Sequence, residues 1–246
     1  MGVRLIAKGV DAEQYATEYA APVRRGLEGI FFLNTTLAKA ARNYASGKPQ
    51  GSIVGAPVPS SLALAVKSRV NFVQTQISEV AEMTFFIVCR TAADGSVTAD
   101  RPMFFSNYQG VNLDGGPSFG LAFYLTSPTR LSGGASYGSD AATNELKLAG
   151  ITKPSVANSW ALFSLSVGPT GVTLRDHTVG NSATISASTP RRTATAKIRI
   201  GSGVSAFDGA ADVAVFQAHS VALTDTEIAS TVLDIRAYIA RRGLIV

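Results

Sequence analysis

Short segments in which apolar residues recur at every second position constrain the fold of this chain more than any other feature. In Met83–Arg90 every odd-numbered position is apolar, and two alternate positions, Phe86 and Val88, are apolar as well. Side chains of a strand point alternately to its two faces, so this pattern predicts a central strand that is buried on both sides. In Phe119–Thr126 the alternation is more regular, with a large apolar residue at every odd-numbered position.

The same kind of pattern recurs along the chain, with glycine-rich turns between the segments. The predicted strands are Leu27–Leu33, Leu62–Val66, Phe72–Thr75, Met83–Arg90, Phe119–Thr126, Trp160–Val167, Val172–Arg175, Lys197–Gly201 and Ala211–His219. The turn Gly168–Gly171 joins two of these strands into a hairpin. Strands at short intervals without long helices between them predict a single all-β antiparallel sandwich and argue against βαβ units.

One long helix is predicted, close to the C-terminus. Thr224 is a favourable N-cap, and Glu227 three residues later completes a capping box. The residues that follow at helical spacing on one face are Ile228, Val232, Ile235 and Ile239. Gly243 ends the helix, and we expect its apolar stripe to pack on a sheet.

The composition is that of a globular protein, since 46% of the 246 residues are hydrophobic and 16% are charged. The one cysteine, Cys89, excludes an intramolecular disulfide, and its apolar surroundings predict a buried and inert thiol. The first residues have no apolar signal core, and no apolar run approaches the ~18 residues that a membrane span needs. We therefore expect synthesis in the cytoplasm, without a signal peptide, a transmembrane segment or membrane insertion.

The net charge of +5 raises the question of nucleic-acid binding. The basic residues are spread along the chain as pairs, at Arg24–Arg25, Arg191–Arg192 and Arg241–Arg242. A protein that reads a nucleic-acid groove concentrates such residues on one face with aromatic residues between them, and no recognised motif occurs here. We expect these arginines at solvated loops and helix ends, and no nucleic-acid partner.

Several short motifs follow one another in an order that a known family shares. They are Gly26–Phe31, Asn43–Gly47, Phe72–Thr75, Glu82–Phe85, Ile198–Gly201, Phe207–Gly209 and Leu223–Ile228. In this order the chain resembles the concanavalin A-like (laminin-G-like) jelly-roll domains, over residues 26–243. The resemblance implies a concanavalin A-like antiparallel jelly-roll sandwich over residues 26–246, with the amphipathic helix at its C-terminal end.

Within that family, the short Ala-, Gly-, Ser- and Thr-rich segments are similar to virion proteins of tailed bacteriophages. This resemblance implies a non-enzymatic structural component of the tail, baseplate or capsid surface, located in the virion after synthesis in the host cytoplasm. Its expected partners are other virion proteins, further copies of itself in a homo-oligomer, and host-surface glycans. The alternative is a soluble glycan-binding lectin that is not part of a virion.

Residues 1–25 precede the first motif of the resemblance, and we interpret them as an N-terminal arm. The arm combines a short apolar piece with two tyrosines, Tyr15 and Tyr19, which lie four positions apart. Our hypothesis is that the arm serves attachment or oligomerisation, with the tyrosines as anchors on a partner. The alternative is that the arm folds back onto the edge of its own sandwich.

No set of residues predicts catalysis. Glycan-cleaving relatives of this fold carry closely spaced carboxylates on one strand, as glycoside hydrolysis requires. Here only Glu79 and Glu82 are close in sequence, and we interpret them as part of a charged turn. The pentapeptide Gly134–Gly138 matches the G-x-S-x-G pattern of hydrolases, but it lacks a buried strand before Ser136 and a helix after it. We therefore place Ser136 in a polar loop.

Two long regions between predicted strands, 106–118 and 132–142, are expected to be exposed loops that carry a binding function. The candidate ligand-binding residues in them are Tyr108, Asn112, Asp114 and Tyr137. The tyrosines offer rings that stack on a sugar, and the two polar residues offer hydrogen bonds. The alternative for the tyrosines is that they pack on the core.

A calcium ion is the one cofactor that the sequence suggests. Asn112 and Asp114 supply oxygen atoms in a loop that two glycines, Gly115 and Gly116, make flexible. The alternative is ordinary turn chemistry, in which these side chains accept hydrogen bonds from the nearby backbone. The two histidines are far apart and have no cysteine partners, so no zinc pattern is present.

Overall fold

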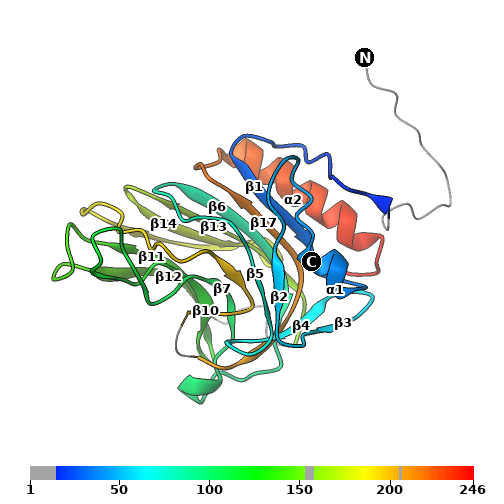
Figure 1. The fold of residues 1–246 in the computed structure, drawn as a ribbon, viewed down its shortest axis with the longest axis horizontal. Coiled ribbons are helices and arrows are strands. Elements are labelled where there is room, and N and C mark those ends of the chain that lie inside the picture. The colour runs from blue at the N-terminus through cyan, green and yellow to red at the C-terminus, as the bar shows by residue number, and fades with distance from the viewer. Residues whose placement is uncertain (1–14, 153–157, 205–206) are drawn as a thin grey trace.

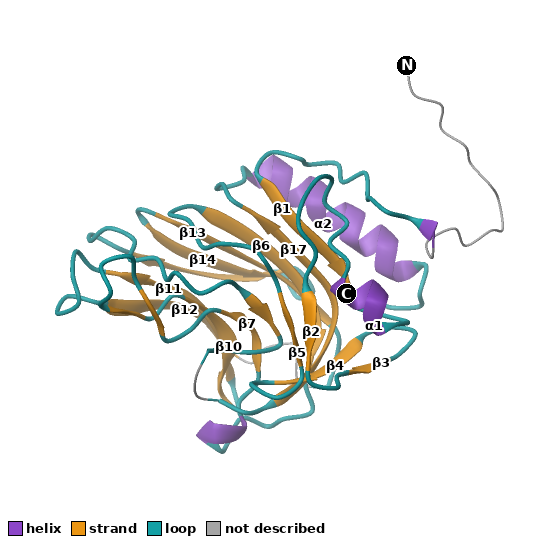
Figure 2. Ribbon diagram, viewed as in Figure 1, coloured by secondary structure: helices purple, strands orange, loops and turns teal. Residues whose placement is uncertain are grey.

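The computed structural model describes residues 15–152, 158–204 and 207–246. Within them the chain forms two antiparallel β-sheets packed face to face, and one long helix covers the outer face of one sheet (Figure 1). Figure 2 shows this helix on one side of the strands and only short helical turns elsewhere. In the described part of the chain, no helix is long and apolar enough to cross a membrane.

The first sheet, sheet A, follows the strand order β15-β14-β13-β6-β17-β4-β3. Strand β1 pairs with the C-terminal half of β17, next to β4 along the same side of that strand. Its strands are β1 (Leu27–Phe32), β3 (Val58–Pro59), β4 (Leu64–Lys67), β6 (Met83–Arg90), β13 (Ala161–Gly168), β14 (Gly171–Asp176), β15 (Asn181–Ser186) and β17 (Ala210–His219).

The second sheet, sheet B, follows the order β12-β11-β10-β7-β16-β5-β2. Its strands are β2 (Ser52–Val54), β5 (Phe72–Gln74), β7 (Met103–Ser106), β10 (Leu121–Ser127), β11 (Arg130–Tyr137), β12 (Glu145–Thr152) and β16 (Arg199–Ile200). A separate two-stranded ribbon consists of β8 (Gly110–Val111) and β9 (Pro117–Ser118). The helical elements are α1 (Leu37–Ala41), a 3-10 turn η2 (Thr98–Asp100) and the long helix α2 (Asp225–Ala240).

Strand β6 lies in the middle of sheet A and is buried on both faces. Phe85 and the free thiol of Cys89 point into the core between the sheets, where the Phe85 ring centroid lies 4.8 Å from that of Phe105 in sheet B. Phe86 and Val88 point the other way, into a second apolar cluster beneath α2. The predictions of a two-sided central strand and of a buried cysteine are therefore confirmed.

Helix α2 begins as its capping box predicted. The Thr224 hydroxyl accepts a hydrogen bond from the Glu227 amide, and the Glu227 carboxylate accepts one from the Thr224 amide. The whole predicted apolar stripe is buried, namely Ile228, Val232, Ile235 and Ile239. Tyr238 adds a ring that stacks on Phe32 of β1 with 4.0 Å between ring centroids. The amphipathic helix thus packs on the outer face of sheet A.

Residues 19–25 of the predicted N-terminal arm lie against this helix. The Tyr19 hydroxyl donates a hydrogen bond of 2.9 Å to the Asp234 carboxylate, which is on α2. Arg25 forms an ion pair of 2.6 Å with Glu227 in the first turn of α2. For these residues the structure matches the alternative in which the arm folds back, and the contact is with α2 rather than with a sheet edge.

Residues 16–18 also contact the sandwich, since the Ala16 carbonyl oxygen accepts a hydrogen bond from Arg42 and the Glu18 carboxylate accepts one from the Ser46 hydroxyl. Tyr15 is 77% exposed, whereas Tyr19 is partly buried against the cluster beneath α2. Residues 1–14 lie outside the described residues. A role of the arm in attachment or oligomerisation therefore stays a prediction, and of the two proposed anchors only Tyr15 is available to a partner.

Among the longer strands, β7, β11, β12 and β15 were missing from the sequence prediction. Strand β11 carries the adjacent glycines Gly133 and Gly134, which weaken the strand signal because they have no side chain to pack. In the sheet a Cβ atom on Gly134 would lie 2.3 Å from the Lys147 carbonyl oxygen of β12. The glycine is thus needed for a close approach of two backbones, which the sequence alone does not reveal.

We expect the docking of α2 to contribute strongly to stability. Ile235→Ala should lower the free energy of unfolding by about 2–5 kcal/mol, because it leaves a cavity under the helix. Ile235→Asp should cost more, because it buries a carboxylate without a partner. Thr224→Ala should cost about 1 kcal/mol through the lost cap. Chemical denaturation measures all three, and equal, negligible effects would show that the helix does not dock.

His177 follows β14 and lies between sheet A and α2. Its Nε2 is 2.8 Å from the Ser164 hydroxyl, and its carbonyl oxygen accepts a hydrogen bond from Arg236 of α2. Burial, reinforced by the charges of Arg175 and Arg236, lowers the pKa of His177 from 6.5 to about 4. The folded protein therefore holds this imidazole neutral at pH values where the unfolded chain protonates it.

This histidine should make the protein less stable in mild acid. The unfolded chain binds a proton below pH 6.5 and the folded chain only near pH 4, so the free energy of unfolding should fall by up to about 3 kcal/mol across that window. His177→Gln should remove the part of this loss of stability that His177 causes. Part of the loss should remain, because burial also lowers the pKa of His219. Urea melts from pH 7 to pH 4 test this, and an unchanged curve in the variant would contradict it.

Candidate functional site

The outer faces of the two sheets differ. Helix α2 and residues 19–25 cover sheet A, whereas the described residues place no helix on the outer face of sheet B. That face instead carries a small cluster of Met103, Ala122 and Tyr124, with further side chains packed against it. We call the four rings gathered there the aromatic face; they are Tyr108, Phe119, Tyr124 and Phe207.

The rings of the aromatic face are arranged around Tyr108. Its ring lies 6.2 Å from that of Phe119 at an interplanar angle of 20°, and 6.5 Å from that of Tyr124 at 29°. Phe207 lies 5.9 Å from Tyr108 and 5.1 Å from Tyr124. Tyr124 is nearly buried, whereas the other three rings are partly exposed. The cluster thus presents ring surface to solvent, with Tyr124 in β10 and the other three rings in the segments beside sheet B.

The tyrosines of this face remain hydrogen-bond donors at physiological pH. Burial raises the pKa of Tyr124 to about 12, and it also raises the pKa of Tyr108. The Tyr124 hydroxyl has no hydrogen-bond partner among the described residues, and Tyr108 has only a long contact of 3.5 Å with Gln109. Stacking surface next to free hydroxyl donors is suited to a ligand with both apolar and polar faces.

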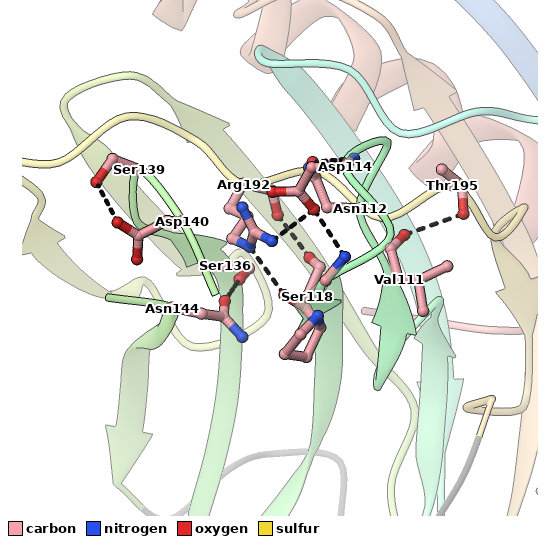
Figure 3. A network of polar contacts seen from close by, with 12 residues as sticks. Val111, Asn112, Asp114, Ser118, Ser136, Ser139, Asp140, Asn144, Arg192 and Thr195 are labelled. Carbon is pink, nitrogen blue, oxygen red and sulfur yellow. Dashed lines mark hydrogen bonds and ion pairs between the residues drawn. The ribbon is translucent and has the colours of Figure 1, made fainter. Parts of the chain in front are cut away.

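Asn112 and Asp114 lie apart from the aromatic face, in the turn between β8 and β9. Figure 3 shows Arg192, from the segment 190–196, beside this turn and bonded to it. Arg192 donates to the Asp114 carboxylate and to the Pro117 carbonyl oxygen, both at 2.8 Å. Asn112 donates to the Thr193 carbonyl oxygen at 2.7 Å. The turn is therefore held in one position by residues about eighty positions later in the chain.

The donor set at this turn does not fit a calcium ion. The Asn112 side-chain oxygen accepts a hydrogen bond from the Asp114 amide, and the Asp114 carboxylate accepts one from the Gly116 amide. The hydrogen bond from Arg192 lowers the pKa of Asp114, and the positive charge of the arginine offsets the negative charge of the carboxylate. In the described residues, no three acidic, histidine or cysteine side chains group around a possible metal position. The loop matches the alternative of ordinary turn chemistry, in which the two side chains accept hydrogen bonds from nearby backbone amides.

Glu79 is not part of a charged turn, as the sequence had suggested, because its side chain is fully buried. It forms an ion pair with Arg191, whose side chain is 2% exposed. The other carboxylate oxygen accepts hydrogen bonds from the Ala194 amide and the Asn107 side chain, at 2.8 and 2.9 Å. Burial raises the pKa of Glu79, and these three donors oppose that rise.

The expectation that Arg191 and Arg192 are solvated was also wrong, because the folded chain buries their side chains. Both side chains are buried at the rim of the sandwich, where each pairs with a carboxylate. Arg191 also donates to the Ser136 carbonyl oxygen of β11 and lies over the Tyr137 ring. The buried pair with Glu79 thus connects β11 to the segment 190–196 and to the loop after β7.

Two further placements in the region 132–142 are corrected, because Ser136 and Tyr137 belong to β11 and not to a loop. Both are fully buried. The Ser136 hydroxyl donates to Asn144 and accepts from the Phe119 amide, so it is not presented to a substrate. The Tyr137 ring lies in the core between the sheets, and its hydroxyl donates to the Gly168 carbonyl oxygen at 2.7 Å. Tyr137 therefore offers no ring to a ligand.

Of the four predicted ligand-binding residues, the structure places only Tyr108 on the aromatic face. Sequence reasoning missed its neighbours Phe119, Tyr124 and Phe207 as site residues. The alternation in Phe119–Thr126 did contain a signal, because Tyr124 is the one large residue on the otherwise small and polar side of that strand. Phe207 gave no such signal, since it lies in a loop and approaches the sheet only in the folded chain.

Neither a protein-family model nor a curated protein sequence matches this chain. Solved structures do share its fold. The receptor binding domain of botulinum neurotoxin D superposes with a TM-score of 0.61 at 8% identity, over 87% of this chain and 54% of that chain. The binding domain of botulinum neurotoxin DC in complex with SialylT gives a TM-score of 0.60 at 9% identity, over 85% of this chain and 51% of that one.

This chain therefore spans about half the length of those binding domains. At such low identity the likeness is one of fold. It agrees with the architecture described above, which is an all-β, concanavalin A-like antiparallel jelly-roll sandwich with one C-terminal amphipathic helix. The predicted fold class is confirmed.

The buried Glu79–Arg191 pair should contribute strongly to the stability of the rim, by which we mean the segment 190–196 with the loop after β7 and the turn between β8 and β9. Arg191→Met leaves the Glu79 carboxylate buried without a countercharge and should lower the free energy of unfolding by about 3–5 kcal/mol. The double variant Glu79→Met/Arg191→Met should cost clearly less than the two single variants together. Arg69→Met, which breaks the exposed pair with Asp208, serves as the control and should have little effect. Strict additivity of the two single changes, measured by denaturant melts, would contradict this interpretation.

Proposed function

We propose that this chain is a non-catalytic component of a bacteriophage virion, in the tail, baseplate or capsid surface, and that its sandwich contacts host-surface glycans through the aromatic face. The observation that carries the proposal is the asymmetry of the two sheets. One outer face is covered by α2 and residues 19–25, and the other presents partly exposed rings with free hydroxyl donors. A ring surface with donors beside it suits the apolar faces and hydroxyl groups of sugars.

The neighbouring rim supports a binding role because it is rigid before any ligand arrives. The Asp114–Arg192 and Glu79–Arg191 pairs fix the loops on both sides of the segment 190–196. A preformed site loses little conformational entropy when it binds a ligand, so weak individual contacts become useful. The fold is shared with domains described as receptor binding, one of them in complex with SialylT, and this favours binding over catalysis.

The residues that resemble catalytic groups are engaged elsewhere, which also favours a non-catalytic role. Glu79 is paired with Arg191, and Ser136 is buried in β11 with its hydroxyl hydrogen-bonded. The alternative function is a soluble lectin outside any virion, and it would use the same aromatic face. The two proposals differ in location and not in the site.

A glycan array tests the binding part of this proposal. Tyr108→Ala and Tyr124→Phe should each reduce binding of any captured glycan by about tenfold, through a lost ring and a lost hydroxyl donor respectively. Tyr15→Ala is the matched control, because Tyr15 is 77% exposed but lies outside the aromatic face, and it should bind like the parent. Equal binding by all three variants would contradict the site, and the absence of any captured glycan would contradict the function.

Mass spectrometry of purified virions tests the location. Detection of the chain in particles that have been washed and banded supports the virion proposal. Its absence from such particles, together with glycan binding by the purified protein, would support the soluble lectin instead.

A further inference from the structure

Three arginines share the outer face of sheet B with the aromatic face, and none of them pairs with a carboxylate in the described residues. They are Arg101, Arg130 and Arg199. We propose that this face binds an acidic glycan, in which some sugar residues carry a carboxylate group. The inference rests on the proposed glycan binding and adds the chemical class of the ligand.

The register of the strands places Arg199 on this face. Arg199 of β16 is the cross-strand partner of Ser106 in β7, and Ser106 is the partner of Ala122 in β10. Cross-strand partners point to the same side of a sheet, and Ala122 belongs to the same cluster as Tyr124. The Arg199 guanidinium lies over the Phe72 ring at 5.2 Å and donates to Gln74 and to the Gly203 carbonyl oxygen.

Arg130 lies on the same face at the other side of the sheet. It is two positions before Ser132 in β11, and Ser132 is the cross-strand partner of Tyr124. Its guanidinium lies across Gly150 of β12, where a Cβ atom would be only 2.3 Å from the arginine Nε. The guanidinium has no hydrogen-bond acceptor among the described residues, and the Arg130 side chain is exposed.

Arg101 comes just before β7, a strand that lies between β11 and β16 in the order of sheet B. It precedes Met103, a member of the same cluster, by two positions, and its charge opposes the rise in the pKa of Tyr124. Its Nε donates to the Gly95 carbonyl oxygen at 3.0 Å, and its two terminal NH₂ groups have no partner in the described residues. Asp100, the acidic residue beside it in sequence, lines a different hollow together with Lys67 and Asp212.

Arginines elsewhere in the fold are commonly neutralised. The pairs are Arg25 with Glu227, Arg69 with Asp208, Arg90 with Asp212, Arg175 with Asp225, Arg191 with Glu79 and Arg192 with Asp114. The unpaired charges on the outer face of sheet B therefore give it a positive potential beside aromatic rings. A face of this kind complements a ligand that brings its own negative charges.

A carboxylate-bearing sugar chain fits this arrangement better than a neutral one. The terminal NH₂ groups of arginine match a carboxylate in a bidentate geometry, which is stronger than a neutral hydrogen bond. From β12 to β16 the face spans four strand spacings, about 19 Å, so the charges suit an extended oligosaccharide rather than a single sugar. The rings between the arginines then contact the sugar faces, and the phenols donate to their oxygens.

The test compares each acidic glycan with its own neutral form. Sialyllactose and trigalacturonic acid are measured by calorimetry beside their carboxyl-reduced counterparts, in which each carboxylate has become a primary alcohol. A wider array then presents further acidic glycans in the same pairs. We expect at least one acidic form to bind about tenfold tighter than its reduced form, and this difference to shrink as salt is added.

The variants Arg101→Gln and Arg130→Gln should lower the affinity for the acidic form about tenfold and leave binding of the reduced form unchanged. Arg24→Gln removes the same charge from the opposite side of the molecule, where Arg24 is exposed within residues 19–25, and should bind like the parent. Melting temperatures confirm that each variant is folded.

Three results would overturn the inference. Equal affinity for acidic and reduced forms would leave the proposed glycan binding intact and exclude the acidic class. Tight binding of acidic forms that survives both arginine changes would place the ligand elsewhere on the molecule. The absence of binding to every glycan of the array would overturn the proposed glycan binding, and this inference with it.

Discussion

The apolar side chains on both faces of β6 are the constraint on which the rest of this structure depends. A strand of this kind must be covered twice, because either face left in water would expose a row of large apolar groups. Sheet B covers one face, where Phe85 meets Phe105. Helix α2 and residues 19–25 cover the other, where Phe86 and Val88 lie. The capping box of α2 and the Tyr19–Asp234 hydrogen bond both serve this second layer.

Sheet B has no such requirement, and this difference creates the candidate site. Its strands bury most of their large apolar residues on the inner side, and on the outer side a small cluster around Met103 and Tyr124 is covered by neighbouring side chains, so no helix is needed there. Rings and arginines are tolerated there and remain accessible to a ligand. The rim beside them is fixed by the Glu79–Arg191 pair, which joins residues 112 positions apart. Because that pair is buried, its geometry is held by the surrounding core rather than by solvent-exposed side chains.

The strand pattern could be predicted from sequence wherever one residue type repeats at period two. Met83–Arg90 and the capped helix were predicted closely, because local periodicity and local capping define them. Strand β11 was not predicted, because its glycines are explained only by the neighbouring β12 backbone. For the same reason Ser136 and Tyr137 were assigned to a loop. Tyr108 was found as a candidate, whereas Phe207 reaches the aromatic face only through the path of the folded chain.

The sequence by itself determined the fold class, the two-sided burial of β6 and the position of α2. Each of these follows from interactions between residues close together in the chain, whose spacing is visible in the sequence. Only the tertiary structure decided which charges are buried and which are free. Glu79 and Arg191 are neutralised because the folded core brings them together, and Arg130 stays unpaired because no carboxylate of the described residues folds to meet it. Pairing over such separations depends on the packing of whole sheets, which no local pattern encodes.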